Sequence, residues 1–108
     1  MTRGNVYWID LEPIRGSEAN RVRPCVIVSN DANNRAAATV TVVPVTSKVA
    51  RIHLFEVDLG DALDRPSKAQ AHQIRTVSKQ RIRGEPIAAL PDTLTTELDE
   101  ALRLHLTL

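Results

Sequence analysis

Arginine and hydroxyl side chains stand at the ends of two apolar segments, where they could bind an anion together. Arg21 and Arg23 precede one apolar run, and Thr46 and Ser47 follow a second. If both runs form β-strands, their cores are held rigidly while their ends present side chains to a ligand. A guanidinium group donates paired hydrogen bonds to phosphate oxygens, and a hydroxyl adds a further donor. The pattern therefore favours a phosphate site at the ends of two strands.

Metal-dependent and cofactor-dependent chemistry is not indicated by the sequence. His53, His72 and His105 lie far apart, and none has a cysteine or a second histidine at the spacing of a zinc site. The carboxylates are scattered singly, unlike the clustered Asp and Glu of two-metal nucleases. The glycines are isolated, so fingerprints for nucleotide phosphates are absent as well. We therefore expect neither a metal nor a cofactor.

The composition is that of a small globular protein. A chain of 108 residues supports one domain with a modest core, so we expect a single domain over residues 1–108. No apolar stretch reaches the roughly 18 residues of a membrane helix, and the N-terminus lacks a signal-peptide core, which predicts a cytoplasmic protein. The single cysteine, Cys25, is expected to be a small buried side chain rather than a nucleophile.

The hydrophobic pattern predicts a mainly β fold followed by one helix. Strands are expected at residues 6–11, 24–29, 39–45, 54–59, 69–74 and 82–90, the fifth of them interrupted by His72 and Gln73. Short helical turns are expected at 30–34 and 78–81. Pro44 lacks an N–H group, which predicts that its end of the strand lies at a sheet edge or a bulge. Several short strands with a terminal helix indicate a small, strongly bent barrel of the SH3-like type.

The terminal helix is expected over residues 93–105. Its apolar face is formed by side chains that recur with the helical period: Leu94, Leu98, Ala101, Leu102 and His105. On the outer face, Asp99 and Arg103 are spaced for an ion pair. In the first strand, Trp8 is expected to face the core on the same side as Val6, with a base-stacking platform as the alternative.

Four short segments, in their order along the chain, resemble the MazF/PemK family of toxin endoribonucleases. These segments are Arg23-Pro24, Pro44-Val45-Thr46-Ser47, Gln73-Ile74-Arg75-Thr76 and the helical residues 97–102. Each segment alone is weakly specific, whereas all four in this order are strongly specific. The resemblance extends over nearly the whole chain, from Arg3 to Leu108.

This resemblance implies a MazF/Kid/CcdB-type toxin fold and a metal-independent, sequence-specific endoribonuclease of the mRNA interferase type. Such an enzyme cuts single-stranded RNA by attack of the 2′-OH and leaves a 2′,3′-cyclic phosphate and a 5′-OH. It also implies a homodimer that acts as the toxin of a type II toxin–antitoxin system. The cognate MazE-like antitoxin would block the RNA groove with an extended segment.

The resemblance assigns roles to individual residues as well. Arg23 and Thr46 match the essential arginine and the essential strand-end hydroxyl of the family. The residues expected to contact RNA are Gly16, Ser17, Glu18, Arg21, Ser47, Lys48, Gln73 and Arg75, of which the first three match a mobile loop over the groove. For Arg75 the alternative is a structural ion pair with Asp10 or Glu12. Because a guanidinium group hardly ever loses its proton, Arg23 is expected to hold the phosphate charge rather than act as a base.

His72 marks a departure from the family pattern. Many relatives carry an aspartate here, in an Asp-Gln-x-Arg-Thr motif. An imidazole titrates near working pH and suits proton transfer, so His72 is expected as a third catalytic residue that accepts the 2′-OH proton. The alternative is that its ring packs against neighbours or bonds to the backbone.

Two other functions remain open from the sequence. One is a non-enzymatic toxin of the gyrase-poisoning type, although those toxins end in a Trp-Gly-Ile tail and this chain ends in His-Leu-Thr-Leu. The other is an SH3-like RNA-binding module, which would need base-stacking aromatic residues. The chain holds only Tyr7, Trp8 and Phe55.

Overall fold

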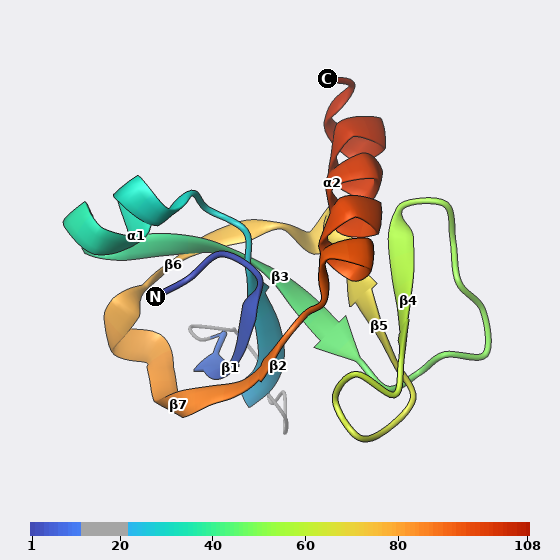
Figure 1. The fold of residues 1–108 in the computed structure, drawn as a ribbon, viewed down its shortest axis with the longest axis horizontal. Helices are drawn as coiled ribbons and strands as arrows, with labels where there is room; N and C mark the ends of the chain where they lie inside the picture. Colours follow the sequence, from blue (N-terminus) through green and yellow to red (C-terminus); the bar gives the residue numbers. More distant parts are fainter. Residues whose placement is uncertain (12–21) are drawn as a thin grey trace, which may run out of the picture.

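The computed structural model describes residues 1–11 and 22–108, and these form a bent antiparallel sheet with a long helix beside it (Figure 1). The strands are β1 (Asn5–Asp10), β2 (Val22–Ile27), β3 (Thr39–Thr46), β4 (Glu56–Gly60), β5 (Ser67–Gln70), β6 (Arg75–Ser78) and β7 (Ile82–Ala89). The helices are α1 (Asp31–Ala36) and α2 (Asp92–Leu106), with single 3₁₀ turns η1 (Ala71–Gln73) and η2 (Lys79–Arg81).

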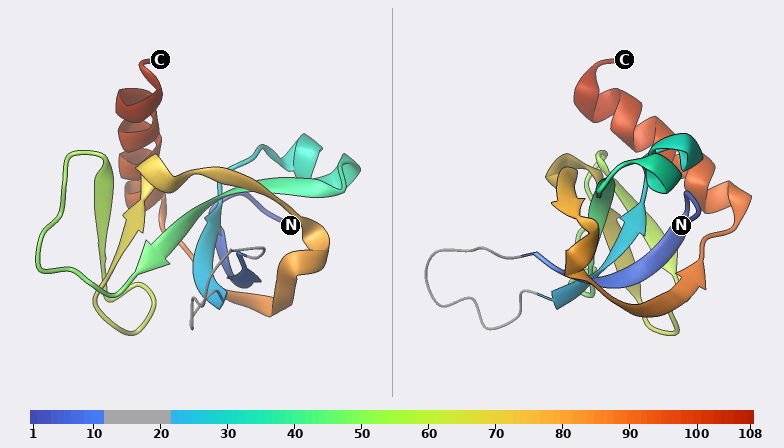
Figure 2. Two further views of the ribbon diagram at one scale, coloured as in Figure 1. Left: turned by 180° about the vertical axis from the view of Figure 1, so that it is seen from behind. Right: turned by 90° about the vertical axis from the view of Figure 1, so that its left-hand side faces the viewer.

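The sheet runs in the order β4-β5-β3-β2-β1-β7, and β6 pairs with β3 off this path. Its strands curl strongly, and α2 packs against β4 and η1 on one side (Figures 1 and 2). Within the described residues the path has two ends, so the sheet is open rather than a closed barrel. The predicted fold class, mainly β with a C-terminal helix in a bent, barrel-like arrangement, is confirmed.

Strand β3 is central to the sheet, so the predicted edge or bulge at Pro44 is wrong. On one side Pro44 lies opposite Cys25 of β2. On the other side β3 changes partner, from Arg75 of β6 opposite Val42 to Ala69 of β5 opposite Val45. Pro44 lies in this interval between two partners, where a missing N–H group removes no regular ladder bond.

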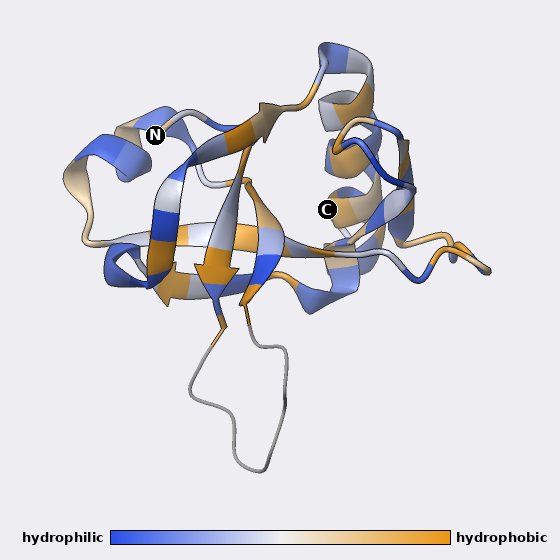
Figure 3. Ribbon diagram, turned by 90° about the horizontal axis from the view of Figure 1, so that it is seen from below, coloured by the Kyte–Doolittle hydropathy of each residue, from blue (hydrophilic) through white to orange (hydrophobic). Residues whose placement is uncertain are grey.

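Two buried clusters lie on opposite faces of the central strands. One cluster fills the space under α2 and includes Val6, Val26, Val45, Leu98 and Leu102. The other lies inside the curl of the sheet and consists of Tyr7, Ile9, Leu11, Cys25, Ile27, Val40, Val42 and Val77. Because β2 contributes to both clusters, its predicted burial on both faces is confirmed. Hydrophobic residues, drawn in orange in Figure 3, accordingly recur along the strands.

The two helices follow their sequence signals. The side chain of Asn30 accepts a hydrogen bond from the backbone N–H of Asn33 and caps α1. In α2 the predicted apolar face is buried from Leu98 to Leu102, but His105 is exposed because the helix end extends past the sheet. Asp99 accepts a hydrogen bond from Arg3 at 2.7 Å, a partner outside the helix.

The strand expected at residues 69–74 is confirmed only in part: the expected interruption at His72 and Gln73 is present, but it ends the strand and separates two strands with different partners. Strand β5 ends at Gln70, the turn η1 follows, and β6 begins at Arg75. His72 and Gln73 therefore belong to a turn rather than to a strand. Similarly, the strand expected from residue 54 begins at Glu56. In the described part of the chain, no helix is both long and apolar enough to cross a membrane.

Candidate functional site

A pocket of about 410 Å³ opens where the ends of β2 and β3 meet. Half of its lining is polar: Arg23, Thr46, Ser47, Lys48, Arg65 and Ser67. The other half is apolar: Trp8, Val22, Pro24, Val45, Leu63 and Ile87. The predicted convergence of an arginine and a hydroxyl from two strand ends is therefore present in the structure.

Among the described residues that line the pocket, three are cations and none is a carboxylate. Arg23 is half-buried on β2, opposite Ile9 of β1, while Lys48 and Arg65 are exposed. Among residues 1–11 and 22–108, no acidic side chain forms an ion pair with any of the three. Their charge is therefore available to a phosphate group, for which a half-buried guanidinium is well suited.

Arg65 was not anticipated from the sequence, although a signal for it exists. It stands before Pro66 at the start of β5, just as Arg23 stands before Pro24 on β2. Arg65 lines the same pocket as Arg23 and Pro24. Only the pairing of β5 with β3 brings the second pair next to the first, and that pairing could not be derived from the local sequence.

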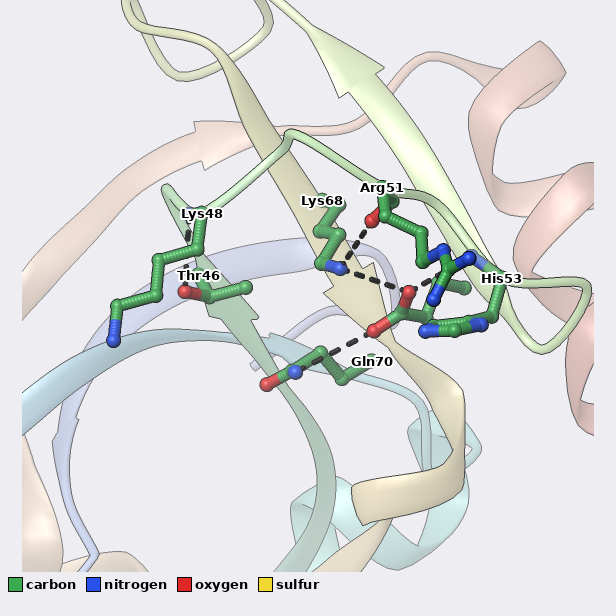
Figure 4. Close-up of polar contacts among 7 residues, drawn as sticks. Thr46, Lys48, Arg51, His53, Lys68 and Gln70 are labelled. Carbon is green, nitrogen blue, oxygen red and sulfur yellow. Dashed lines mark hydrogen bonds and ion pairs between the residues drawn. The ribbon is translucent and has the colours of Figure 1, made fainter.

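The hydroxyl of Thr46 is oriented by the chain that follows it. Its Oγ1 atom accepts a hydrogen bond from the backbone N–H of Lys48 at 3.2 Å (Figure 4). Because the oxygen already accepts this bond, its own hydrogen is free to donate to a ligand. The turn after β3 thus presents a hydroxyl donor, a lysine and the hydroxyl of Ser47 to the pocket.

A buried ion pair lies behind the end of β3. Lys68, which is opposite Thr46 in the sheet register, donates to Glu56 at 2.9 Å and to the backbone carbonyl of Arg51 at 2.6 Å (Figure 4). The side chains of Lys68 and Glu56 are only 9% and 2% exposed. Sequence reasoning missed this pair, because isolated charged residues on short strands are normally solvent-exposed. Lys68 therefore acts on the strand that carries Thr46 rather than on a ligand.

The carboxyl of Glu56 is held in its ionised form. Burial alone would raise its pKa, but the backbone N–H of His53 and the side chains of Lys68 and Gln70 outweigh burial and hold the pKa below its usual range. The distances are 2.9 Å to His53, 2.9 Å to Lys68 and 3.5 Å to Gln70. The pair is thus a charged, hydrogen-bonded support.

Trp8 lines the pocket, so its predicted burial in the core is wrong. It is 39% exposed, although Val6, two residues earlier on the same face of β1, is completely buried. The helix α2 covers Val6 but does not extend over Trp8, which lies opposite Pro24 of β2 and Arg83 of β7. The alternation rule identified the correct face but not how much of it is covered.

The thiol of Cys25 is chemically inert at neutral pH. Burial raises its pKa to about 12, and the nearby guanidinium groups of Arg75 and Arg23 only partly oppose that rise. Because both guanidinium groups lower the pKa of Cys25, both arginines lie near this thiol, on the inner face of the curled sheet. Arg75 is not among the described residues that line the pocket. Of its two predicted ion-pair partners, Asp10 pairs with Arg83 at 3.1 Å, and Glu12 lies outside the described residues.

His72 and Gln73 lie apart from the pocket. The His72 ring contacts Phe55 edge-on at a centroid distance of 4.5 Å and faces His105 of α2 at 6.5 Å. Gln73 is exposed on the same turn. The pocket thus unites Arg23, Thr46, Ser47 and Lys48 from the predicted set, but not His72, Gln73 or Arg75.

Four predicted RNA contacts, Gly16, Ser17, Glu18 and Arg21, lie outside the described residues. Within residues 1–11 and 22–108, no group of three or more His, Cys, Asp or Glu side chains is arranged to hold a metal ion. The chemistry that the described residues bring to the pocket is therefore that of cations, hydroxyl donors and an apolar wall. Such a site can hold a phosphodiester and neutralise charge that develops on it.

Comparison with known proteins agrees with this chemistry. The family model described as PemK-like, MazF-like toxin of type II toxin–antitoxin system matches residues 2–106. Endoribonuclease MazF9 of Mycobacterium tuberculosis is 45% identical over 116 residues, covering 100% of this chain and 98% of the relative. Endoribonuclease EndoA of Bacillus subtilis is 37% identical over 110 residues, covering 98% and 94%. A solved mycobacterial endoribonuclease in complex with its cognate antitoxin superimposes with a TM-score of 0.83 at 29% identity, covering 100% of this chain and 96% of the other.

Proposed function

Because this chain belongs to the PemK-like, MazF-like toxin family of type II toxin–antitoxin systems, we propose that it is the toxin of such a system and an endoribonuclease acting on single-stranded RNA. The observation that supports this most directly is the pocket itself. It combines Arg23, Thr46 and two further cations, and the described part of its lining holds no carboxylate.

The proposed reaction uses the RNA's own 2′-OH as the nucleophile. This oxygen attacks the adjacent phosphorus, the bond to the 5′-oxygen breaks, and the products carry a 2′,3′-cyclic phosphate and a 5′-OH. The protein then has to fix the phosphate in line and stabilise the charge of the phosphorane. No group in this scheme has to be a metal ion.

Arg23 and Thr46 divide the work of charge stabilisation. The Arg23 guanidinium binds the non-bridging phosphate oxygens and is the stronger donor, because it is charged and half-buried. The Thr46 hydroxyl, whose oxygen is already bonded to the Lys48 N–H, donates a second, neutral hydrogen bond. The leaving 5′-oxygen takes up one proton from solvent, and solvent takes up the proton of the 2′-OH, so the cyclisation releases no net proton.

The same pocket serves as the target of the antitoxin in this proposal. An acidic, extended peptide and an RNA chain both complement an unpaired cationic surface, so the two should compete. A homodimer is part of the proposal. Three apolar side chains are exposed on α2 and the residues after it, namely Leu104, Leu106 and Leu108, and their burial against a second copy would stabilise this small chain. Its RNA substrate places the toxin's action in the cytoplasm.

Cleavage in EDTA tests the proposal. Purified protein is incubated with a long single-stranded RNA in the presence and absence of EDTA, and the new ends are mapped. We expect equal cleavage in both, with cyclic phosphate and 5′-OH ends at a short recurring sequence. Activity that disappears in EDTA and returns with magnesium would refute the metal-independent scheme, and an absence of cleavage in every condition would refute the enzyme itself.

A further inference from the structure

We propose that Trp8 is a stacking platform for one nucleobase of the RNA bound in the pocket. This inference rests on the proposed function, because it assigns a base-binding subsite next to the phosphate site of Arg23. Trp8 would be a positioning residue: it fixes the nucleotide beside the scissile phosphate and takes no part in bond making or breaking.

The first argument is the exposure of a large aromatic side chain in the middle of a paired strand. Trp8 lies opposite Pro24 on one side and Arg83 on the other, yet 39% of its surface reaches solvent. An indole contributes a large apolar area, so leaving this much of it uncovered forgoes stabilisation that a core position would provide. Exposure at the wall of a pocket is the arrangement expected of a ligand contact.

The second argument is the shape of the neighbouring strand. Along β7 the register against β1 shifts, since Val6 lies opposite Ala88 whereas Trp8 lies opposite Arg83. The intervening residues 84–87 therefore protrude from the regular ladder, and Gly84 adopts a φ of +77° that favours glycine. Ile87 of this segment is 43% exposed and lines the same pocket as Trp8. The irregular strand thus adds an apolar surface to the indole instead of covering it.

The third argument is the charge around the apolar wall. Trp8 and Pro24 form one cross-strand pair, and Ile9 and Arg23 form the next pair along the same ladder. The Arg23 side chain therefore starts on the other face of the sheet from the indole, yet both side chains line the pocket at the end of β2. Single-stranded nucleic acids are bound by this combination of an aromatic face for the base and cations for the backbone. An apolar wall beside cations fits a nucleotide.

The fourth argument is rigidity. Strand β1 is paired on both sides, with β2 and β7, so the backbone of Trp8 is fixed in the sheet. An aromatic ring also has few rotatable bonds, so little conformational entropy is lost when a base stacks on it. Such a platform can set the distance between a base and the phosphate held by Arg23.

The experiment uses the full chain and two matched ligands that cannot be cleaved. One is a short single-stranded oligodeoxynucleotide of mixed sequence, and the other has the same length and phosphates but abasic residues throughout. Affinities are measured for wild type, Trp8→Leu, which keeps apolar bulk without a ring, and Trp8→Phe, which keeps a ring. Because Trp8 is the only tryptophan, its fluorescence in the wild type reports stacking directly.

We expect Trp8→Leu to bind the base-containing ligand roughly 5- to 150-fold more weakly than wild type, and Trp8→Phe to recover part of this loss. All three proteins should bind the abasic ligand equally, since that ligand offers only phosphates. The base-containing ligand should quench the fluorescence of wild type, and the abasic ligand should leave it unchanged.

Several outcomes would overturn the platform while leaving the nuclease intact. Equal affinity of Trp8→Leu and wild type for the base-containing ligand, with RNA cleavage present in both, would remove Trp8 from RNA binding. An equal loss for both ligands would mean that Trp8 supports the fold or the phosphate site. A loss confined to binding of the antitoxin would assign the indole to a protein partner. By contrast, a wild type that cleaves no RNA would contradict the proposed function itself.

Discussion

Replacing Lys68 by methionine should destabilise the protein strongly, because it leaves the buried carboxylate of Glu56 without its cation. Lys68→Met removes two short hydrogen bonds, the 2.9 Å bond to Glu56 and the 2.6 Å bond to the Arg51 carbonyl. The side chain of Glu56 is only 2% exposed, so water cannot replace the lost ammonium group. Breaking one half of such a pair typically costs about 3–5 kcal/mol of the free energy of unfolding.

The pH dependence of this loss gives a second, sharper test. In the wild type the pKa of Glu56 is held below its usual value of 4.5. The ionised carboxylate therefore contributes fully to stability above pH 4.5, and this contribution is lost as the pH falls through the lower pKa of the folded state. In Lys68→Met, burial acts with less opposition and raises the pKa. Protonation then relieves the unpaired charge, so the destabilisation should be largest near neutral pH and shrink toward about pH 5.

Urea denaturation at several pH values and one fixed protein concentration measures both effects. Arg83→Met is the matched control, because it breaks the 3.1 Å pair with Asp10 in which the arginine is 51% exposed. Such a pair should contribute at most about 1 kcal/mol. In the double variant Lys68→Met/Glu56→Leu, most of the lost stability should return, since no unpaired charge is left buried.

A loss in Lys68→Met no larger than that in Arg83→Met would refute the claim that the Glu56–Lys68 pair is a buried support. A loss of stability that stays constant between neutral and mildly acidic pH would also refute it, because an unpaired Glu56 destabilises the variant only while it is ionised. Failure of the double variant to recover would assign the loss to packing of the lysine stem instead of to charge.

Other predictions concern the pocket and its surroundings. Arg23→Ala should lower kcat about 100- to 1000-fold, with much less effect on the binding of a 2′-deoxy oligonucleotide. The control variant Arg35→Ala, on the exposed face of α1, should match wild type in both measurements. Normal turnover in Arg23→Ala would show that Arg23 takes no part in the reaction. Thr46→Ala should likewise lower kcat more than it weakens binding, but by a smaller factor, because a neutral hydroxyl donates a weaker hydrogen bond. A variant that is defective only in binding would contradict this role of Thr46. Because the His72 ring packs between Phe55 and His105, His72→Ala should lower thermal stability. The shape of the pH–rate profile should be unchanged, and loss of its acid limb in the variant would instead show that His72 transfers a proton.

The elements with strong local signals could be predicted from the sequence. An uninterrupted apolar run identified β2, and a helical period over two turns identified α2. The convergence of Arg23 and Thr46 was also predictable, since both stand at the ends of strands with clear patterns. These features depend on residues close together in sequence, where side-chain pattern and backbone conformation are directly coupled.

The features that could not be predicted depend on what covers a residue in three dimensions. Alternation places Val6 and Trp8 on one face, but only the position of α2 decides that the first is buried and the second exposed. The pairing of Glu56 with Lys68 requires β4 to lie beside β5. The turn η1 interrupts a segment whose composition favours a strand, because the chain there leaves β5 and crosses to β6.

The central place of β3 has a consequence for when the toxin first becomes harmful during its own synthesis. Arg23 and Thr46 leave the ribosome early, but the strand that carries Thr46 is completed by β5, and the pocket wall by Ile87 of β7. The helix α2, which closes the main core, is made after all of the described strands. Since a small domain folds as a unit, the nascent chain cannot hold this pocket together until its final segments are free. We therefore expect a nascent chain to acquire nuclease activity only after α2 has left the ribosome.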